Sequence, residues 1–199
     1  MKKRLLVPMF LTFNLLLMLL ATSCSFLKPA PYQEVNYYTI GSAPKQVPIT
    51  YNIEVKNFNS LLPEKNRMVY TKDNYHVLID DYNKWIQPPE FMIRNYVMSK
   101  FSSKNNKSCK TFVIKGVVDN FSINTNSKNA DLVVRYSIFQ KKRPLNPVFS
   151  KSFQREVSFE KIQPEYFAKS FAMLSDLLAI DIKNSIDDYL NEAIKNEIK

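Results

Sequence analysis

The chain has 199 residues, with 28 Lys and Arg against 18 Asp and Glu, so its formal net charge is +10. A chain of this length is expected to form one folded domain, and 45% hydrophobic with 13% aromatic residues excludes an intrinsically disordered protein. The two glycines, Gly41 and Gly116, stand far apart. This excludes the glycine-rich phosphate loops of nucleotide-binding enzymes and the Gly-x-Ser-x-Gly turn of α/β-hydrolases.

The N-terminal residues have the order of a secretory signal peptide. A basic start, Lys2-Lys3-Arg4, precedes an apolar stretch from Leu5 to Leu20, and small residues follow up to Cys24. The apolar stretch is shorter than the roughly 20 residues that span a bilayer. We therefore expect residues 1–23 to be removed, with an uncleaved N-terminal anchor as the alternative.

Cys24 is predicted to carry a lipid. The sequence Ala21-Thr22-Ser23-Cys24 resembles the lipobox of bacterial lipoproteins, in which the cysteine thiol is acylated and the chain is cut directly before it. Two or three acyl chains would anchor the protein durably, because each buried methylene contributes about 0.8 kcal/mol. Residues 24–34 are expected to be a short lipidated tether, and residues 35–199 are expected to be the domain.

The mature chain would keep 25 basic against 18 acidic residues, a net charge of +7. A basic protein inside a cell suggests nucleic-acid binding, but an exported protein does not meet nucleic acid, so no such partner is expected. Anionic lipid headgroups, an acidic partner or a solvated lysine-rich surface remain as interpretations. Cys109 would be the only free thiol, which excludes an intramolecular disulfide, and it is expected to lie in a polar loop.

Alternating apolar and polar residues predict strands in the first half of the mature chain. The segments Val35–Ile40 and Tyr51–Val55 have this pattern. Met68–Tyr70 and Tyr75–Ile79 are predicted to pair as a hairpin, because the Asp-Asn pair at 73–74 between them favours a turn.

A helix is predicted to begin at Pro88-Pro89-Glu90, because proline suits the first turn of a helix and glutamate suits its positive end. After this helix, Phe112–Val118 is almost continuously apolar, which is typical of a central strand covered on both faces. The apolar stripe of the helix is expected to contain Phe91, Met92, Tyr96, Val97 and Phe101.

The last third of the chain predicts two more strands and a long helix. Leu132–Ile138 alternates, Lys141-Lys142-Arg143-Pro144 predicts a basic turn, and Phe149–Phe159 predicts a more polar edge strand. Together the elements predict an α/β (α+β) domain with a mixed β-sheet, packed helices and a long C-terminal helix. That helix is predicted after Pro164 from apolar residues three or four apart: Phe167, Phe171, Leu174, Leu178, Ile182, Ile186, Tyr189 and Ala193.

Candidate catalytic residues are few. His76 is the only histidine, so a zinc site or a catalytic triad lacks its partners, and His76 is expected to be structural or exposed. Asp80 and Asp81 would suggest acid–base catalysis in a periplasmic hydrolase, but neighbours on an extended chain point in opposite directions. We therefore expect these aspartates to shape a turn or cap a helix, and we expect no catalytic residue, metal or cofactor.

Three further features have two interpretations each. Trp85, the only tryptophan, is expected to anchor against the helix that follows it, with a ligand platform as the alternative. The basic turn at 141–143 is expected to be a solvated hairpin tip, with contact to headgroups or a partner as the alternative. The apolar stripe of the C-terminal helix is expected to lie in the core, with a seam between copies of a homo-oligomer as the second interpretation.

Three segments carry a resemblance to a known family. They are Tyr37-Tyr38-Thr39-Ile40, Arg67-Met68-Val69-Tyr70 and Asp81-Tyr82-Asn83-Lys84-Trp85-Ile86-Gln87-Pro88-Pro89. Together they resemble the ABC-type transport auxiliary lipoprotein family, which includes the third component of the paraquat-inducible (Pqi) operon type. The residues that fit the motif positions of the family are Tyr38, Tyr70, Tyr82, Trp85 and Pro89.

The resemblance implies a fold like the anticodon-binding domain or the TolB N-terminal domain. It implies a periplasm-facing lipoprotein, usually held in the outer membrane, which Ser25 after Cys24 also favours. The implied partners are an MCE-domain protein and the permease and ATPase of an ABC transporter, which move phospholipid between membranes. Only the acyl attachment at Cys24 is carried over as a site. The alternative function is an unrelated outer-membrane assembly lipoprotein that escorts lipopolysaccharide or an envelope complex.

Overall fold

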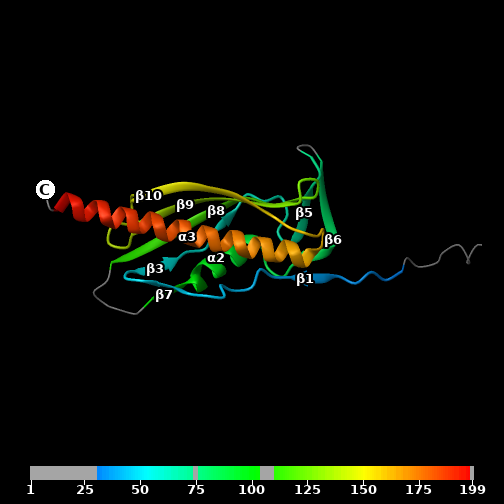
Figure 1. The fold of residues 1–199 in the computed structure, drawn as a ribbon, viewed down its shortest axis with the longest axis horizontal. Helices are drawn as coiled ribbons and strands as arrows, with labels where there is room; N and C mark the ends of the chain where they lie inside the picture. The colour runs from blue at the N-terminus through cyan, green and yellow to red at the C-terminus, as the bar shows by residue number, and fades with distance from the viewer. Residues whose placement is uncertain (1–30, 74–75, 104–109, 198–199) are drawn as a thin grey trace, which may run out of the picture. The chain divides into compact units, whose positions relative to one another are not determined.

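The computed structural model describes residues 31–73, 76–103 and 110–197, and the residues from Val35 onward form one compact unit. Within these residues, eight strands form a mixed β-sheet, two strands form a small parallel sheet, and two helices pack on the larger sheet (Figure 1). The elements are β1 (Asn36–Tyr38), β2 (Val47–Ile49), β3 (Asn52–Val55), β4 (Asn59–Ser60), β5 (Arg67–Thr71), β6 (Val77–Trp85), α2 (Pro89–Lys100), β7 (Phe101–Ser103), β8 (Thr111–Asn124), β9 (Asn129–Gln140), β10 (Phe149–Ser158) and α3 (Pro164–Glu197).

Strand β8 is the centre of the sheet. It pairs antiparallel with β9 along nearly its whole length, and β10 continues this ladder as the edge strand. On its other side, β3, β4 and β5 pair with β8 in parallel, one after another along the strand. β6 then pairs antiparallel with β5, and β1 pairs parallel with β6. The central position of β8 and the edge position of β10 are as the sequence predicts.

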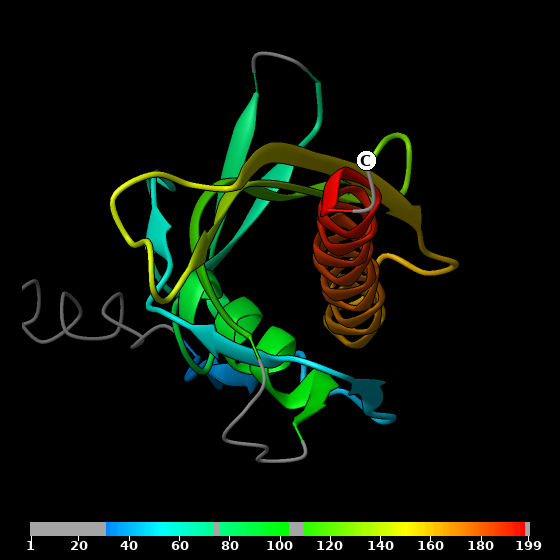
Figure 2. The same ribbon diagram turned by 90° about the vertical axis from the view of Figure 1, so that its left-hand side faces the viewer.

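The ladder of β8, β9 and β10 has two chemically different faces. Alternate residues from the three strands face α3, and this inner face is apolar because it forms the core. Figure 2 shows α2 and α3 side by side against the curved sheet. The buried residues of the inner face include Phe112, Ile114, Val118, Leu132, Val134, Ile138 and Phe153, and those of α3 include Phe167, Phe171, Leu174, Leu178, Ile182 and Ile186.

Helix α2 begins where the sequence predicts, with Pro88 as N-cap and Pro89 in the first turn. Its predicted stripe is wrong at Phe91, whose side chain is 41% exposed, while Ile93 is fully buried. The reason is that α2 is covered on two sides, by α3 and by β3 with β8, so its buried positions are adjacent pairs. The last residue, Lys100, has a buried side chain and forms an ion pair with the partly exposed Asp176 of α3.

The structure confirms the predicted α+β fold with its mixed sheet and long C-terminal helix. Two boundaries near the hairpin are different. The first strand is shorter than Val35–Ile40, and the predicted turn at Asp80 and Asp81 is wrong because β6 continues through them to Trp85. The Asp80 side chain bends the strand locally, since its Oδ1 accepts hydrogen bonds from the backbone N–H groups of Tyr82 and Asn83. The β5–β6 register shifts at the same level, as in a β-bulge.

Candidate functional site

The predicted lipid attachment site, Cys24, and the second cysteine, Cys109, lie outside the described residues. Signal peptide, acylation and free thiol therefore stay predictions. Among the residues that the structure does describe, neither helix combines the length and the apolar composition needed to cross a bilayer.

Trp85 is a core residue, as expected, and not a ligand platform. Its ring meets Phe121 of β8 edge-on, with centroids 5.2 Å apart, and Phe171 of α3 at 5.7 Å. Phe121 and Phe171 stack on each other at 3.6 Å. The anchor therefore joins β6 to the central strand and to the C-terminal helix. The aromatic partners of Trp85 come from β8 and α3, and its expected packing against α2 stays a prediction.

The other residues that carry the family resemblance are mostly framework. Tyr70 is half-buried, donates a hydrogen bond to Asp80 Oδ2 at 2.8 Å, and meets Phe167 edge-on. Burial and the adjacent Asp80 carboxylate raise the pKa of Tyr70 far above its usual value, so the phenol keeps its proton. The Tyr38 hydroxyl donates a hydrogen bond of 3.5 Å to Glu165 Oε1 at the start of α3. Tyr82 differs from these residues, because its side chain is exposed.

The two adjacent carboxylates have separate partners, which argues against a joint catalytic role. Asp80 accepts hydrogen bonds from Tyr70, Tyr82 and Asn83. Burial alone would raise the pKa of Asp80, but these hydrogen bonds outweigh it and hold the pKa below its usual value. Asp81 instead forms an exposed ion pair with Arg67 at 2.8 Å.

His76 is exposed and follows the hairpin turn, where its backbone N–H donates to Asp73 Oδ1. Across residues 31–73, 76–103 and 110–197, no group of three or more His, Cys, Asp or Glu residues is placed to hold a metal ion. The basic turn after β9 is exposed throughout. One of its cations, Lys141, pairs with Glu54 of β3 at 3.2 Å.

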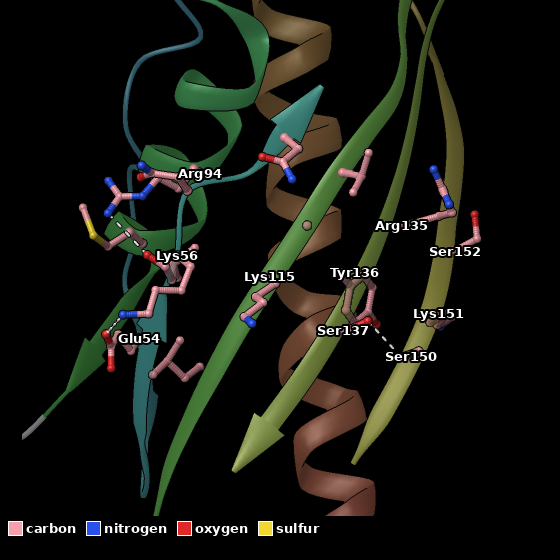
Figure 3. Close-up of a pocket in the computed structure, with 17 residues that line it drawn as sticks. Glu54, Lys56, Arg94, Lys115, Arg135, Tyr136, Ser137, Ser150, Lys151 and Ser152 are labelled. Atoms are coloured by element: carbon pink, nitrogen blue, oxygen red, sulfur yellow. Dashed lines mark hydrogen bonds and ion pairs between the residues drawn. The ribbon is translucent and has the colours of Figure 1, made fainter. Parts of the chain in front are cut away.

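A groove with a volume of about 1200 Å³ lies on the outer face of the sheet, turned away from α3. Figure 3 shows it crossing from α2 past β3 to β8, β9 and β10. Its side chains are mixed, with the cations Lys56, Arg94, Lys115 and Arg135, the hydroxyls Ser137, Ser150 and Ser152, and the apolar Ile53, Met98 and Val117. Lys151 also borders the groove, but its ammonium is paired with Asp181 of α3.

Including Lys151, three of the five groove cations are neutralised by carboxylates. Arg135 forms two hydrogen bonds with Asp119, at 2.6 and 2.8 Å, and this contact lowers the pKa of Asp119. Lys56 pairs with Glu54, whose pKa is likewise lowered. Arg94 and Lys115 have no carboxylate partner among the described residues.

This groove is not apparent from the sequence, for a physical reason. Its members come from α2 and five strands, most of them distant from one another in the chain, so no local motif contains them. The alternation of β8 and β9 does indicate that Lys115 and Arg135 point to one face. Their place in one groove follows only from two long-range pairings. Val117 of β8 lies opposite Arg135 of β9, and β3 pairs in parallel with β8.

A second surface feature lies on β6. Val77, Leu78 and Ile79 are consecutive apolar residues, and their side chains are 52%, 50% and 41% exposed. β1 pairs only with Asn83–Trp85, so within the described residues the outer edge of β6 has no partner strand from Val77 to Tyr82. Exposed apolar strand edges are uncommon in proteins because they invite pairing with another chain.

Comparison with known proteins supports the fold and goes no further. No family model matches the chain, and no curated protein matches it. One similar solved structure is described as an uncharacterized protein, with a TM-score of 0.62 and 14% identity over 78% of this chain and 99% of that one. Another is a protein from Xanthomonas campestris under the family model DUF330, with a TM-score of 0.63 and 11% identity over 80% of this chain and 99% of that one. These proteins have the same fold as the chain described here.

Proposed function

We propose that this protein is a non-enzymatic lipoprotein accessory component of an MCE- and ABC-type system that moves lipid between membranes. The observation that carries the proposal is the aromatic cluster that Trp85 forms with Phe121 and Phe171. The segment that resembles the family motif forms the connection between β6, β8 and α3, so the resemblance falls on residues that determine the fold. The lipobox-like sequence before Cys24 supplies the second support, because it would tether this domain to a membrane.

In this proposal the domain is a docking module at the outer membrane, and the acyl chains at Cys24 hold it there. The periplasmic end of the MCE-domain protein would add an extended segment to the free edge of β6. Three exposed apolar side chains, at Val77, Leu78 and Ile79, would be buried in this way. Strand addition suits such a site, because main-chain hydrogen bonds and alternating side-chain contacts form together.

Co-purification tests the proposal. The full-length protein, solubilised from membranes in mild detergent, is expected to recover an MCE-domain protein together with the permease and ATPase. The Cys24→Ala variant is expected to remain an uncleaved precursor at the inner membrane and to lose these partners. Normal outer-membrane lipoprotein in that variant would contradict the acylation of Cys24. Repeated failure to recover the partners with stable, acylated protein would overturn the transport role, and recovery of a lipopolysaccharide or envelope-assembly complex would favour the alternative.

A matched pair of variants tests the docking edge. Leu78→Asp is expected to remove partner recovery, because it places a charge in the apolar edge of β6. Leu145→Asp is the control, because it makes the same substitution at a site away from β6. Leu145 is 91% exposed and lies in the turn between β9 and β10. Equal partner recovery with both variants would exclude the β6 edge as the docking site.

A further inference from the structure

The outer-face groove contains more positive charge than its own carboxylates neutralise. Lys56 and Arg135 have acidic partners, whereas Arg94 and Lys115 have none among the described residues. These two cations come from different elements, α2 and β8, and line the same groove (Figure 3). An unneutralised pair of cations in a hollow raises the local concentration of anions.

Arg94 is held in place but not fully hydrogen-bonded. Its guanidinium donates to the Val55 carbonyl at 3.3 Å and to the Asn95 side chain at 2.9 Å. A guanidinium has five N–H donors, so these two contacts leave donors over. One of them, the Nε–H, is buried without a partner in the described part of the chain. A buried donor without an acceptor is costly, so the Arg94 side chain would gain free energy from a rearrangement that brings an acceptor to it.

Lys115 is positioned from the opposite side of β3. It is an exposed residue of β8, and its ammonium lies 4.7 Å from the centre of the Phe139 ring. This cation–π contact orients the ammonium without neutralising it. Farther along the groove, Ser137 and Ser150 share a hydrogen bond of 2.9 Å across β9 and β10, and Ser152 lies one outward position beyond them.

We propose that this groove binds a phosphate group, presented either by a lipid headgroup or as a free phosphate, through its two unneutralised cations, Arg94 and Lys115. A phosphate offers several acceptor oxygens, which match the fork of an arginine and the point charge of a lysine. The apolar residues Ile53, Met98 and Val117 line the same groove and would contact carbon atoms attached to the phosphate. This inference is independent of the proposed function, because it uses neither Cys24 nor the β6 edge.

Titration of the mature acylated protein in neutral detergent micelles tests the phosphate site. The ligands are sodium phosphate, glycerophosphoglycerol as a lipid headgroup without acyl chains, and sodium acetate, all at one ionic strength. Backbone amide shifts of Lys115, Gly116 and Val117 report binding at the groove. We expect both phosphate compounds, or one of them, to shift these amides and acetate to leave them unchanged. Tighter binding of glycerophosphoglycerol assigns the lipid headgroup as the source, and tighter binding of inorganic phosphate assigns the free anion.

Charge variants locate the site. Lys115→Gln is expected to weaken binding about tenfold, because it removes one charge-assisted contact. Lys142→Gln removes the same charge from the exposed turn outside the groove and is expected to leave the affinity unchanged. Arg94→Lys keeps the charge but removes the fork, and it is also expected to weaken binding.

Three results would overturn the proposal. They are the absence of groove shifts with both phosphate compounds, equal binding of acetate, and equal weakening by Lys142→Gln. Acetate binding would indicate an acidic protein segment as the occupant. Because the partner co-purification does not depend on Lys115, recovery of the MCE-domain protein with Lys115→Gln separates a failed phosphate site from a failed transport role.

Discussion

The inner and outer faces of the β8–β9–β10 ladder are made by the same three strands, yet they serve different ends. On the inner face, most alternate residues are apolar and pack against α3. On the outer face, the intervening residues include cations, carboxylates and hydroxyls beside apolar residues such as Val117, and this face borders an open groove. A strand with a period of two can therefore separate stability from recognition, because a change on one face need not disturb the other.

The largest effect is expected from the inner side, at Trp85. Trp85→Ala removes a buried ring that contacts Phe121 and Phe171, so the free energy of unfolding should fall by about 3–5 kcal/mol. Urea unfolding measures this loss. Phe91→Ala, on the exposed side of α2, is the control and should cost far less. Unchanged unfolding of Trp85→Ala with lost partner binding would instead assign Trp85 to an interface.

Neighbouring residues 115 and 116 give the sharpest test of the two faces. A Cβ atom at Gly116 would lie 2.8–2.9 Å from the Phe58 ring, so Gly116→Ala should destabilise the fold by about 1–3 kcal/mol. Lys115→Ala, one residue away on the outer face, should change stability by less than about 0.5 kcal/mol. In a double-mutant cycle, Phe58→Leu should reduce the loss of unfolding free energy caused by Gly116→Ala, because it removes the ring that the new methyl group would meet. If the free-energy changes of the two substitutions simply add, the steric explanation is contradicted.

The smallest effect is expected from Asp131, a partly buried acid on the outer face of β9. Burial raises the pKa of Asp131, Glu156 on the neighbouring strand adds to this, and a hydrogen bond from Asn120 opposes it. Because the folded pKa lies above the unfolded one, the protonated form favours folding. This contribution is present at low pH and is lost as pH rises through the folded pKa.

Asp131→Asn should therefore stabilise the protein near neutral pH, by less than about 1 kcal/mol because the site is partly solvent-screened. The gain should disappear below about pH 4, where the native aspartate is protonated as well. Unfolding midpoints measured across this pH range check the prediction. A variant that is less stable than the native chain at pH 7 would contradict it.

The fold was predictable wherever one element has a strong local pattern. Three elements show this, because residues close in sequence are enough to predict each one. They are the strand at the continuously apolar Phe112–Val118, helix α2 after its prolines, and helix α3 with its regular apolar spacing. Errors arose where distant elements decide. Phe91 lies outside the buried stripe because α2 is covered by both α3 and β3. A bulge replaces the turn expected at Asp80, because β5 pairs with β6 on both sides of that position.

The candidate site was less predictable than the fold. The sequence directs attention to adjacent residues such as Asp80 and Asp81, which the structure gives separate partners. The groove depends on Arg94 from α2 and Lys115 from β8, which come to line one groove only through the β3–β8 pairing. Such a site is created by pairing between strands that are far apart in the sequence. Its only local sequence signal is the alternation of β8, which places Lys115 on the outer face.

The pairing of β1 with β6 has a mechanical consequence. If Cys24 holds the acyl anchor, a load between the membrane and a docked partner enters the domain through β1, which has only three residue pairs with β6. Hydrogen bonds between strands run across the strand direction, so a pull along β1 loads them together in shear and does not open them one at a time. The Tyr38 carbonyl adds one more such bond, from the N–H of Ile86 at 2.8 Å. The first strand would then be the short element that transmits this load from the tether to the sheet.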